Sequence, residues 1–331
     1  MSSRSVLRCD VTTGDWVLFA PARAQRPHRP APPPAPSPPP GRCPFCPGNE
    51  ALTPPEVLRL DDGAGGWSVR VVPNLYPALD PSLTPARHDQ GPVFRALEGC
   101  GVHEVVIEST EHARPLSQQP LEQAERILQV LHRRFCALKA DPRLQAIVLF
   151  KNQGERAGTS LTHPHWQLIA TPIVPRLLRL EQAVARDYFN RTSRSLYGVV
   201  LDEELAAGTR VLSANEDFVA VLPWASQVPY QVRILPREQR SSFAGVDPDR
   251  LRPLARMLQG VLGRLERVLA APDFNLTLGT APLADEDNGY YRWHLDVLPR
   301  LATPAGFELG SGMAINPVLP EEAASALREV D

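Results

Sequence analysis

The sequence predicts an α+β protein made of two homologous halves, each an antiparallel sheet with a covering helix. Two stretches of the chain carry the same order of elements: strand, helix, strand, loop and strand. Both helices have apolar residues at three- and four-residue spacing, which is typical of a helix packed on a sheet. We therefore expect an N-terminal half over residues 1–175 and a C-terminal half over residues 176–331.

The elements of the two copies can be placed from their composition and length. The first copy is expected to contain, in chain order, a strand at 103–112, a helix at 121–140, a strand at 145–152 and a strand within 163–172. The second copy is expected to contain a strand at 230–239, a helix at 249–271, a strand at 274–280 and a strand within 292–300. Laying one copy over the other pairs His112 with Gln239, His163 with His294, and His165 with Asp296. The polar chemistry is thus concentrated in the first half.

Before the first copy, TGDWVLFAPARAQRP is typical of a short strand that runs into a loop carrying Arg23 and Arg26. Residues 27–42, PHRPAPPPAPSPPPGR, are rich enough in proline to exclude helix and sheet. We expect an exposed, polyproline-like stretch there and derive no function for it.

Composition excludes several classes of function. The 331 residues carry a formal net charge of −2, which favours neither nucleic acid nor a membrane surface as a partner. The N-terminal MSSRSVLRCD lacks the apolar core of a signal peptide, and no apolar run has the length of a membrane span. The five cysteines are an odd number and do not indicate a disulfide framework. We expect a cytoplasmic protein.

The four residues Cys43-Pro-Phe-Cys46 have the spacing of one half of a zinc site. A single CxxC is also compatible with a redox pair or with two free thiols. Because there is no second CxxC, the remaining ligands would be histidines, and His112 and His163 lie at strand ends on one edge of the first half. A Cys2His2 set closes the tetrahedron around zinc, so the site would be structural.

The segment HPHWQ suggests a nucleophile. On a strand, His163, His165 and Gln167 share one face, and Trp166 points to the other. With His163 bound to zinc, His165 is the next imidazole on that face, and a neutral imidazole is a good nucleophile toward phosphorus. Several polar groups could donate hydrogen bonds to a phosphoryl group at His165: Gln167, the loop of residues 152–160 with its hydroxyls of Thr159 and Ser160, and the guanidinium groups of Arg23 and Arg26. Each of these taken alone is more often an ordinary polar residue, but together they favour a phosphoryl-binding site.

These residues resemble the galactose-1-phosphate uridylyltransferase family of the histidine-triad superfamily over nearly the whole chain. The most specific block is FKNQGERAGTSLTHPHWQLIATP, and CPFCPGNE and STEHARPL resemble the zinc-ligand segments. The resemblance implies zinc ligands Cys43, Cys46, His112 and His163, a nucleophile His165, and a phosphoryl-binding amide Gln167. It implies substrate contacts at Arg23, Arg26, Asn74, Asn152, Gly158, Thr159, Ser160, Phe307 and Ser311.

The resemblance also implies two histidine-triad-like halves, a homodimer and ping-pong chemistry. His165 would attack the α-phosphorus of UDP-glucose, glucose 1-phosphate would leave, and galactose 1-phosphate would take up the uridylyl group. Small histidine-triad hydrolases have a third histidine at the position of Gln167, and a glutamine cannot supply a proton to a leaving group. Gln167 therefore favours transfer over hydrolysis.

Residues 306–324, GFELGSGMAINPVLPEEAA, are more similar to the branch of ADP-sugar phosphorylases. An alternative function is therefore transfer of AMP from an ADP-sugar or a dinucleotide to phosphate. A catalytically idle nucleotide-binding protein is a further alternative, which the intact His163, His165 and Gln167 disfavour. Many family members bind a second metal through one glutamate and three histidines. Here Glu181 and His294 match, but Asp296 and Gly279 stand at the other two places, so we expect no second metal.

Overall fold

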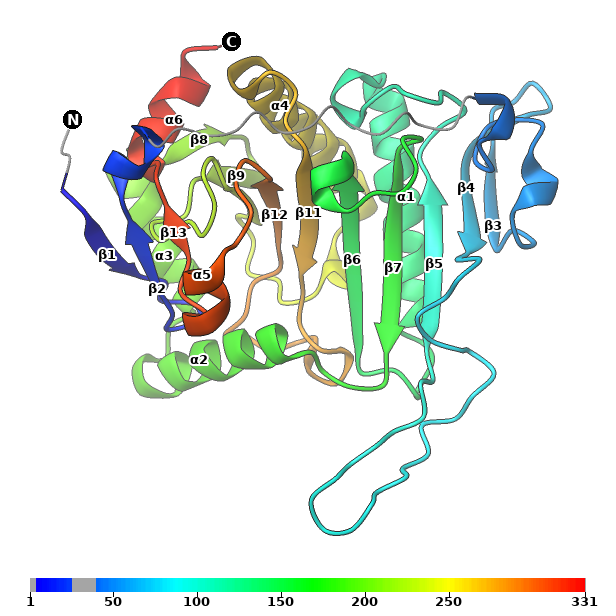
Figure 1. Ribbon diagram of the computed structural model, residues 1–331, viewed down its shortest axis with the longest axis horizontal. Coiled ribbons are helices and arrows are strands. Elements are labelled where there is room, and N and C mark those ends of the chain that lie inside the picture. The colour runs from blue at the N-terminus through cyan, green and yellow to red at the C-terminus, as the bar shows by residue number, and fades with distance from the viewer. Residues whose placement is uncertain (1–3, 26–39, 331) are drawn as a thin grey trace.

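The computed structural model describes residues 4–25 and 40–330. Ten strands form one continuous antiparallel sheet in the order β3-β4-β5-β7-β6-β11-β12-β10-β9-β8 (Figure 1). The first half supplies β3 (Leu58–Asp61), β4 (Trp67–Pro73), β5 (Val102–Ile107), β6 (Ala146–Gln153) and β7 (His165–Thr171). The second half supplies β8 (Val211–Ala214), β9 (Phe218–Val221), β10 (Val232–Pro236), β11 (Phe274–Gly279) and β12 (His294–Pro299).

The strand order confirms the predicted repeat. The order β3-β4-β5-β7-β6 in the first half recurs as β8-β9-β10-β12-β11 in the second. The two half-sheets are not separate, however, because β6 pairs antiparallel with β11, with Gln153 opposite Phe274 and Phe150 opposite Thr277. The two sheets expected from the sequence are therefore one sheet with a joint at its centre.

The structure corrects the alignment of the two copies by two residues. The ring of His165, at the start of β7, has its Nδ1 2.9 Å from the carbonyl oxygen of His163. The ring of His294, at the start of β12, has its Nδ1 3.1 Å from the carbonyl oxygen of Arg292. His294 is thus the counterpart of His165, not of His163. A two-residue shift keeps every side chain on its own face of the strand, so the apolar pattern cannot detect it.

Two long helices, α1 (Leu121–Leu138) and α4 (Leu251–Leu269), pack on each other and cover one face of the sheet. Their apolar faces and the inward residues of both half-sheets form one hydrophobic core. Trp166 and Leu168 of β7 point into this core and are fully buried. This confirms that Trp166 faces away from the side chains of His165 and Gln167.

The opposite face of the second half is covered by α2 (Arg176–Thr192) and α3 (Leu196–Ala207), which pack on β9 and β10 through Tyr197, Val219 and Leu235. Beside them lies a small sheet of β1 (Val6–Cys9), β2 (Trp16–Phe19) and β13 (Ile315–Asn316), in which β13 runs parallel to β2. The corresponding face of the first half is covered by the turn that carries Cys43 and Cys46.

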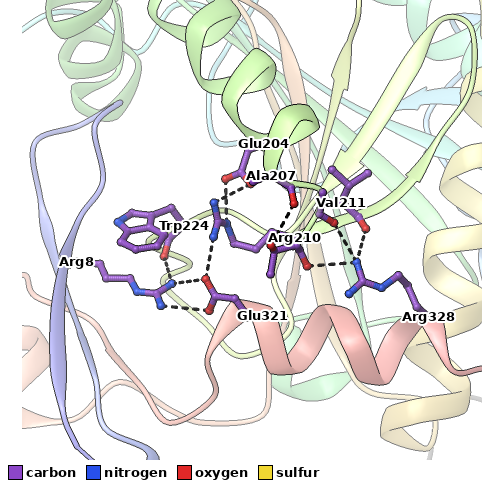
Figure 2. A network of polar contacts seen from close by, with 10 residues as sticks. Arg8, Glu204, Ala207, Arg210, Val211, Trp224, Glu321 and Arg328 are labelled. Carbon is purple, nitrogen blue, oxygen red and sulfur yellow. Dashed lines mark hydrogen bonds and ion pairs between the residues drawn. The ribbon is translucent and has the colours of Figure 1, made fainter. Parts of the chain in front are cut away.

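A polar network ties the two ends of the chain together (Figure 2). Arg8 of β1 donates two hydrogen bonds to Glu321, at the start of α6 (Pro320–Arg328), and lies 3.8 Å from the centre of the Trp224 ring. Arg210 bridges Glu321 to Glu204 of α3. The N-terminal strands therefore lie against the second half. The boundary predicted between residues 175 and 176 falls between β7 and α2, and it stays a prediction.

Arg26 and most of the proline-rich stretch lie outside the described residues. At its described end, Pro40–Arg42 forms a short 3-10 turn, so the expectation of extended backbone is wrong there. Between β4 and β5 the chain projects as a long arm, seen at the bottom of Figure 1, with Arg87 bridged to Leu97 and Gln90 to Phe94. No helix within residues 4–25 and 40–330 is long and apolar enough to cross a membrane.

Candidate active site and zinc centre

The two cysteines and two histidines expected to bind zinc come together at the end of the first half-sheet. Cys43 and Cys46 lie on one turn, closed by a hydrogen bond of 3.2 Å from the Cys46 N–H to the Cys43 carbonyl. The ligand atoms of Cys43, Cys46, His112 and His163 all lie within 4.8 Å of one another. Among the described residues, no other set of histidine, cysteine or acidic side chains gathers in this way.

The geometry and protonation of this cluster fit Zn²⁺. The Nε2–H of His163 donates to the Ser109 carbonyl at 2.8 Å, which leaves Nδ1 without a hydrogen and directed at the thiols. The distances from Cys46 Sγ to Nδ1 of His112 and His163 are 3.2 and 3.6 Å. A tetrahedral zinc ion places sulfur and nitrogen ligands about 3.6 Å apart. Burial and the adjacent Cys43 raise the pKa of Cys46 to about 11, and a bound cation would favour the thiolate instead.

His165 has the orientation and the charge of a nucleophile. Its Nδ1–H donates to the carbonyl of His163, which leaves the lone pair of Nε2 available for reaction. Burial lowers its pKa to about 4, so the ring is neutral at pH 7. The ring of Phe45, from the CxxC turn, packs edge-on against it at 5.3 Å between centroids. The turn that carries Cys43 and Cys46 therefore also holds the ring of His165 in place.

A cavity of about 330 Å³ opens beside His165. Its wall combines apolar side chains such as Phe45 and Val72 with the polar groups of Asn74, Ser160 and Gln167. The structure thus brings together four of the residues selected from the sequence, because His165 lines the same cavity. A mostly apolar pocket with a few convergent polar groups is the usual form of a small-molecule site.

Sequence reasoning missed His103, which lies on β5 next to β7. Its Nε2 is 2.9 Å from Oε1 of Gln167, and its Nδ1 accepts a hydrogen bond of 3.1 Å from the Ala78 N–H. The register of the sheet places Val105 opposite Gln167, so His103 is on the same face two residues away. Strand alternation within VHEVVI places His103 on the same face as Val105, but only the pairing of β5 with β7 brings it beside Gln167.

The loop after β6 is shaped by glycines and held by the second half. Gly154 and Gly158 have φ angles of +86° and +87°, which a side chain disfavours. Asn275 of β11 donates hydrogen bonds of 2.8 Å to the side-chain oxygen of Asn152 and to the Ala157 carbonyl. The hydroxyl of Thr159 donates to the Leu161 carbonyl at 2.9 Å. The joint between the half-sheets therefore positions this loop.

Three predicted substrate contacts lie away from the His165 cavity. Arg23 is exposed on a short turn after β2. Phe307 and Ser311 belong to α5 (Gly306–Ser311), which lies beside β2 and β13 in Figure 1. The Ser311 hydroxyl donates to the Phe307 carbonyl at 2.6 Å. None of the three lines the cavity at His165, and their roles stay predictions, as does that of Arg26.

The residues of the possible second metal site do not fit a metal ion. Arg233 forms two hydrogen bonds, of 2.9 and 2.8 Å, with the carboxylate of Asp296. Although burial opposes it, this guanidinium holds the pKa of Asp296 below its usual range. Glu181 accepts a hydrogen bond from the Tyr291 hydroxyl at 2.8 Å, and burial raises its pKa to about 7. Arg233 therefore provides the positive charge beside the Asp296 carboxylate, where a metal ion would otherwise have to lie.

Comparison with known proteins agrees with these observations. The sequence model of the galactose-1-phosphate uridyl transferase family, N-terminal domain, matches residues 2–175. The chain is 35% identical to an ADP-glucose phosphorylase of Arabidopsis thaliana over 98% of this chain and 92% of that protein. It is 27% identical to a galactose-1-phosphate uridylyltransferase of Thermotoga maritima over 98% of both chains.

Two solved structures have the same fold. One is an ADP-glucose phosphorylase from Arabidopsis thaliana with bound ADP-glucose, which has a TM-score of 0.87, 32% identity, and coverage of 99% of this chain and 100% of that one. The other is a uridylyltransferase with a TM-score of 0.77, 26% identity and coverage of 98% of both chains. The family match, the full-length relatives and the shared fold establish that the chain belongs to the galactose-1-phosphate uridyl transferase family.

Proposed function

We propose that the protein is a nucleotidyltransferase that works through a covalent nucleotidyl-His165 intermediate. The observation that supports this most directly is the neutral His165, whose Nδ1–H is bound to the His163 carbonyl and whose Nε2 is left unprotonated. It lines a cavity together with the amide of Gln167. An imidazole held in this way can attack phosphorus without first losing a proton.

The proposed reaction has two balanced steps. In the first, the Nε2 lone pair forms a bond to the α-phosphorus of the nucleotide-sugar, and the bond to the bridging oxygen breaks. The sugar 1-phosphate leaves with that electron pair, and the positive charge of the ring is stabilised by the His163 carbonyl at Nδ1. In the second, a phosphate oxygen of the acceptor attacks the same phosphorus, the N–P bond breaks, and its electron pair returns to His165.

For the substrates, we propose ADP-glucose as donor and inorganic phosphate as acceptor, which gives ADP and glucose 1-phosphate. The full-length similarity to the Arabidopsis thaliana protein named ADP-glucose phosphorylase supports this choice. The alternative is UDP-glucose with galactose 1-phosphate, the first expectation from the sequence, and the Thermotoga maritima relative supports it at lower identity. We therefore rank ADP-glucose above UDP-glucose, which is the reverse of the order expected from the sequence.

We propose that Cys43, Cys46, His112 and His163 hold a structural zinc ion. Zinc would tie the CxxC turn to the start of β7 and so fix the backbone whose carbonyl orients His165. A closed Cys2His2 set leaves no position for a substrate or water. The chemistry therefore belongs to His165 and its neighbours.

We also propose a homodimer. Arg23, Phe307 and Ser311 lie away from the His165 cavity of their own chain. If they contact substrate, a second copy has to bring them to that cavity. Light scattering coupled to size exclusion tests this, and a monomer at working enzyme concentration would exclude the arrangement.

The decisive experiment is labelling with donors that carry ³²P in the α-phosphate. The protein is incubated separately with labelled ADP-glucose and UDP-glucose, and protein-bound label is tested for stability in acid and base. We expect acid-labile, base-stable label, lost in His165→Ala and kept in the control His88→Ala, whose imidazole is exposed on the arm. The donor that gives label identifies the base. No label from either donor, with folded and zinc-loaded protein, would refute the transferase.

A further inference from the structure

Three amide side chains lie near His165: Asn74 and Gln167 in the cavity, and Asn152 on the neighbouring strand. Asn74 and Gln167 line the cavity with His165. On β6, Lys151 lies opposite Trp166 of β7, so the next residue, Asn152, lies opposite His165. Asn152 is two residues from Phe150 and therefore points to the same face of the sheet. An amide can present either its oxygen or its NH₂ group to a ligand. Since the oxygens of a phosphoryl group only accept hydrogen bonds, the direction of each amide decides whether it attracts or repels the substrate.

The direction of Gln167 is set through His103. The Ala78 N–H is a backbone donor that cannot reverse, and it lies 3.1 Å from Nδ1 of His103, so Nδ1 is the acceptor. A neutral His103 therefore carries its hydrogen on Nε2. The Gln167 atom 2.9 Å from this Nε2–H has to be the acceptor Oε1. The NH₂ group of Gln167 is thereby left for the ligand.

Asn74 is fixed by a backbone donor in the same manner. Its Oδ1 accepts a hydrogen bond of 2.9 Å from the Tyr76 N–H. Its Nδ2 is 3.1 Å from Nε2 of His103, but a protonated Nε2 cannot accept a hydrogen bond from it. The hydrogens of Asn74 Nδ2 are therefore also available to a ligand in the cavity.

The direction of Asn152 is set from the second half of the protein. The carbonyl of Ala157 is a backbone acceptor, and Asn275 lies 2.8 Å from it through Nδ2, which fixes the amide of Asn275. The same Nδ2 is 2.8 Å from the side chain of Asn152, so the Asn152 atom at this contact is Oδ1. The NH₂ group of Asn152 consequently faces away from Asn275.

We propose that His103 and Asn275 are positioning residues that fix the direction of the Gln167 and Asn152 amides, so that both amides present their NH₂ groups to the phosphoryl group. The proposal rests on the proposed nucleotidyl transfer at His165. Each amide direction is ultimately determined by a backbone group, namely Ala78 N–H, Tyr76 N–H or Ala157 C=O. Donors oriented before the substrate arrives need no reorganisation in the transition state. Asn275 also gives the second half a direct part in the site of the first.

The first test needs no turnover. Ring ¹⁵N signals of His103, assigned by their loss in His103→Phe, report which nitrogen carries the hydrogen. We expect hydrogen on Nε2 and an unprotonated Nδ1 in the substrate-free protein at pH 7.5. Hydrogen on Nδ1, or on both nitrogens, would overturn the orientation of Gln167. This result is independent of whether the protein takes up label, so it separates failure of this proposal from failure of the proposed function.

The second test is a double-mutant cycle on the rate of His165 labelling in a single turnover. His103→Phe is expected to lower this rate about 10- to 100-fold, the range for a lost hydrogen bond to a charged group. Combined with Gln167→Ala, it should lower the rate no further than Gln167→Ala alone, because His103 acts only through Gln167. His88→Phe serves as the matched control and should label at the wild-type rate. Multiplicative losses in the double variant would refute a positioning role.

The same cycle applies to the other pair. Asn275→Asp keeps the shape of the side chain but places an acceptor against Oδ1 of Asn152, which forces that amide to turn its NH₂ group away from the substrate. We expect the labelling rate to fall about tenfold or more, with no additional fall when Asn152→Ala is already present. A wild-type labelling rate in Asn275→Asp would exclude the role of Asn275.

Discussion

A buried ion pair lies beneath the proposed site. The Lys151 ammonium and the Glu108 carboxylate are completely buried and 2.6 Å apart. Lys151 donates to Oε1 of Glu108, so Oε2 has no hydrogen-bond partner among the described residues, and burial lowers the pKa of Lys151. The backbone of Glu108 also donates to the Pro164 carbonyl at 3.2 Å, between the two site histidines. Lys151→Met therefore leaves an uncompensated carboxylate directly behind the site.

The expected effect can be estimated from this geometry. Breaking a buried pair from one side destabilises by about 3–5 kcal/mol, whereas replacing both partners by apolar residues of similar volume is often neutral or stabilising. At about 2.1 cal/mol/K per residue, a chain of this length has an unfolding entropy near 0.7 kcal/mol/K. Lys151→Met should therefore lower Tm by about 4–7 °C. The double variant Lys151→Met/Glu108→Leu should recover most of that loss.

The assay is urea unfolding followed by circular dichroism, with calorimetry for Tm, on wild type, both single variants and the double variant. Zinc content is measured on each, so that a lost metal is not mistaken for a lost ion pair. We expect the effects of the two substitutions on the free energy of unfolding to be strongly non-additive. If the double variant is as unstable as the sum of the single variants, the pair is a net stabiliser and the argument from desolvation is wrong.

Three further outcomes are expected. Cys43→Ser should lower zinc content and Tm relative to the control Cys136→Ser, and unchanged zinc by atomic absorption would exclude the Cys2His2 site. Burial raises the folded-state pKa of Glu181 to about 7, so between pH 4.5 and 7 the unfolded protein loses a proton that the folded protein keeps. The free energy of unfolding should therefore fall by about 3 kcal/mol as pH rises over this range. In urea unfolding at several pH values, Glu181→Gln should remove most of this dependence of stability on pH. An unchanged dependence would contradict the role given to Glu181. Gly154→Ala should impair His165 labelling about tenfold or more and lower Tm, since the added methyl group would collide with Asp273 at a left-handed φ; wild-type labelling would show that the loop tolerates this residue.

Much of the fold could be predicted because the strands and helices of the repeat have strong apolar periodicity. The elements expected at 121–140 and 249–271 correspond to α1 and α4, and those at 145–152 and 274–280 to β6 and β11. The Cys2His2 cluster could be predicted because Cys43 and Cys46 have the spacing of half a zinc site, and because His112 and His163 lie close to strand ends on the same edge. Periodicity does not specify which strands meet across the halves, so the β6–β11 joint was not predicted.

Other parts depend on contacts that local sequence cannot encode. His103 was missed because a lone histidine in a β-rich segment is ordinarily a core or surface residue, and its role comes from Ala78 and Gln167. The alignment of the copies slipped by two residues because strand alternation repeats every two. Asn275 was likewise invisible, because its partners lie more than a hundred residues earlier in the chain.

The small sheet of β1, β2 and β13 joins residues that are synthesised at very different times. Val17 and Phe19 of β2 are buried against Ala225, Ala314 and Leu319, and β2 pairs with a strand formed by residues 315 and 316. At about 5–20 residues per second, the ribosome needs about 15–60 s to make the roughly 300 residues between them. During that time β2 lacks its second partner strand, β13, and the apolar cover of Ala314 and Leu319. β2 therefore reaches its native position only after residues made much later, and a nascent chain arrested before residue 315 should expose β2 to proteases and chaperones.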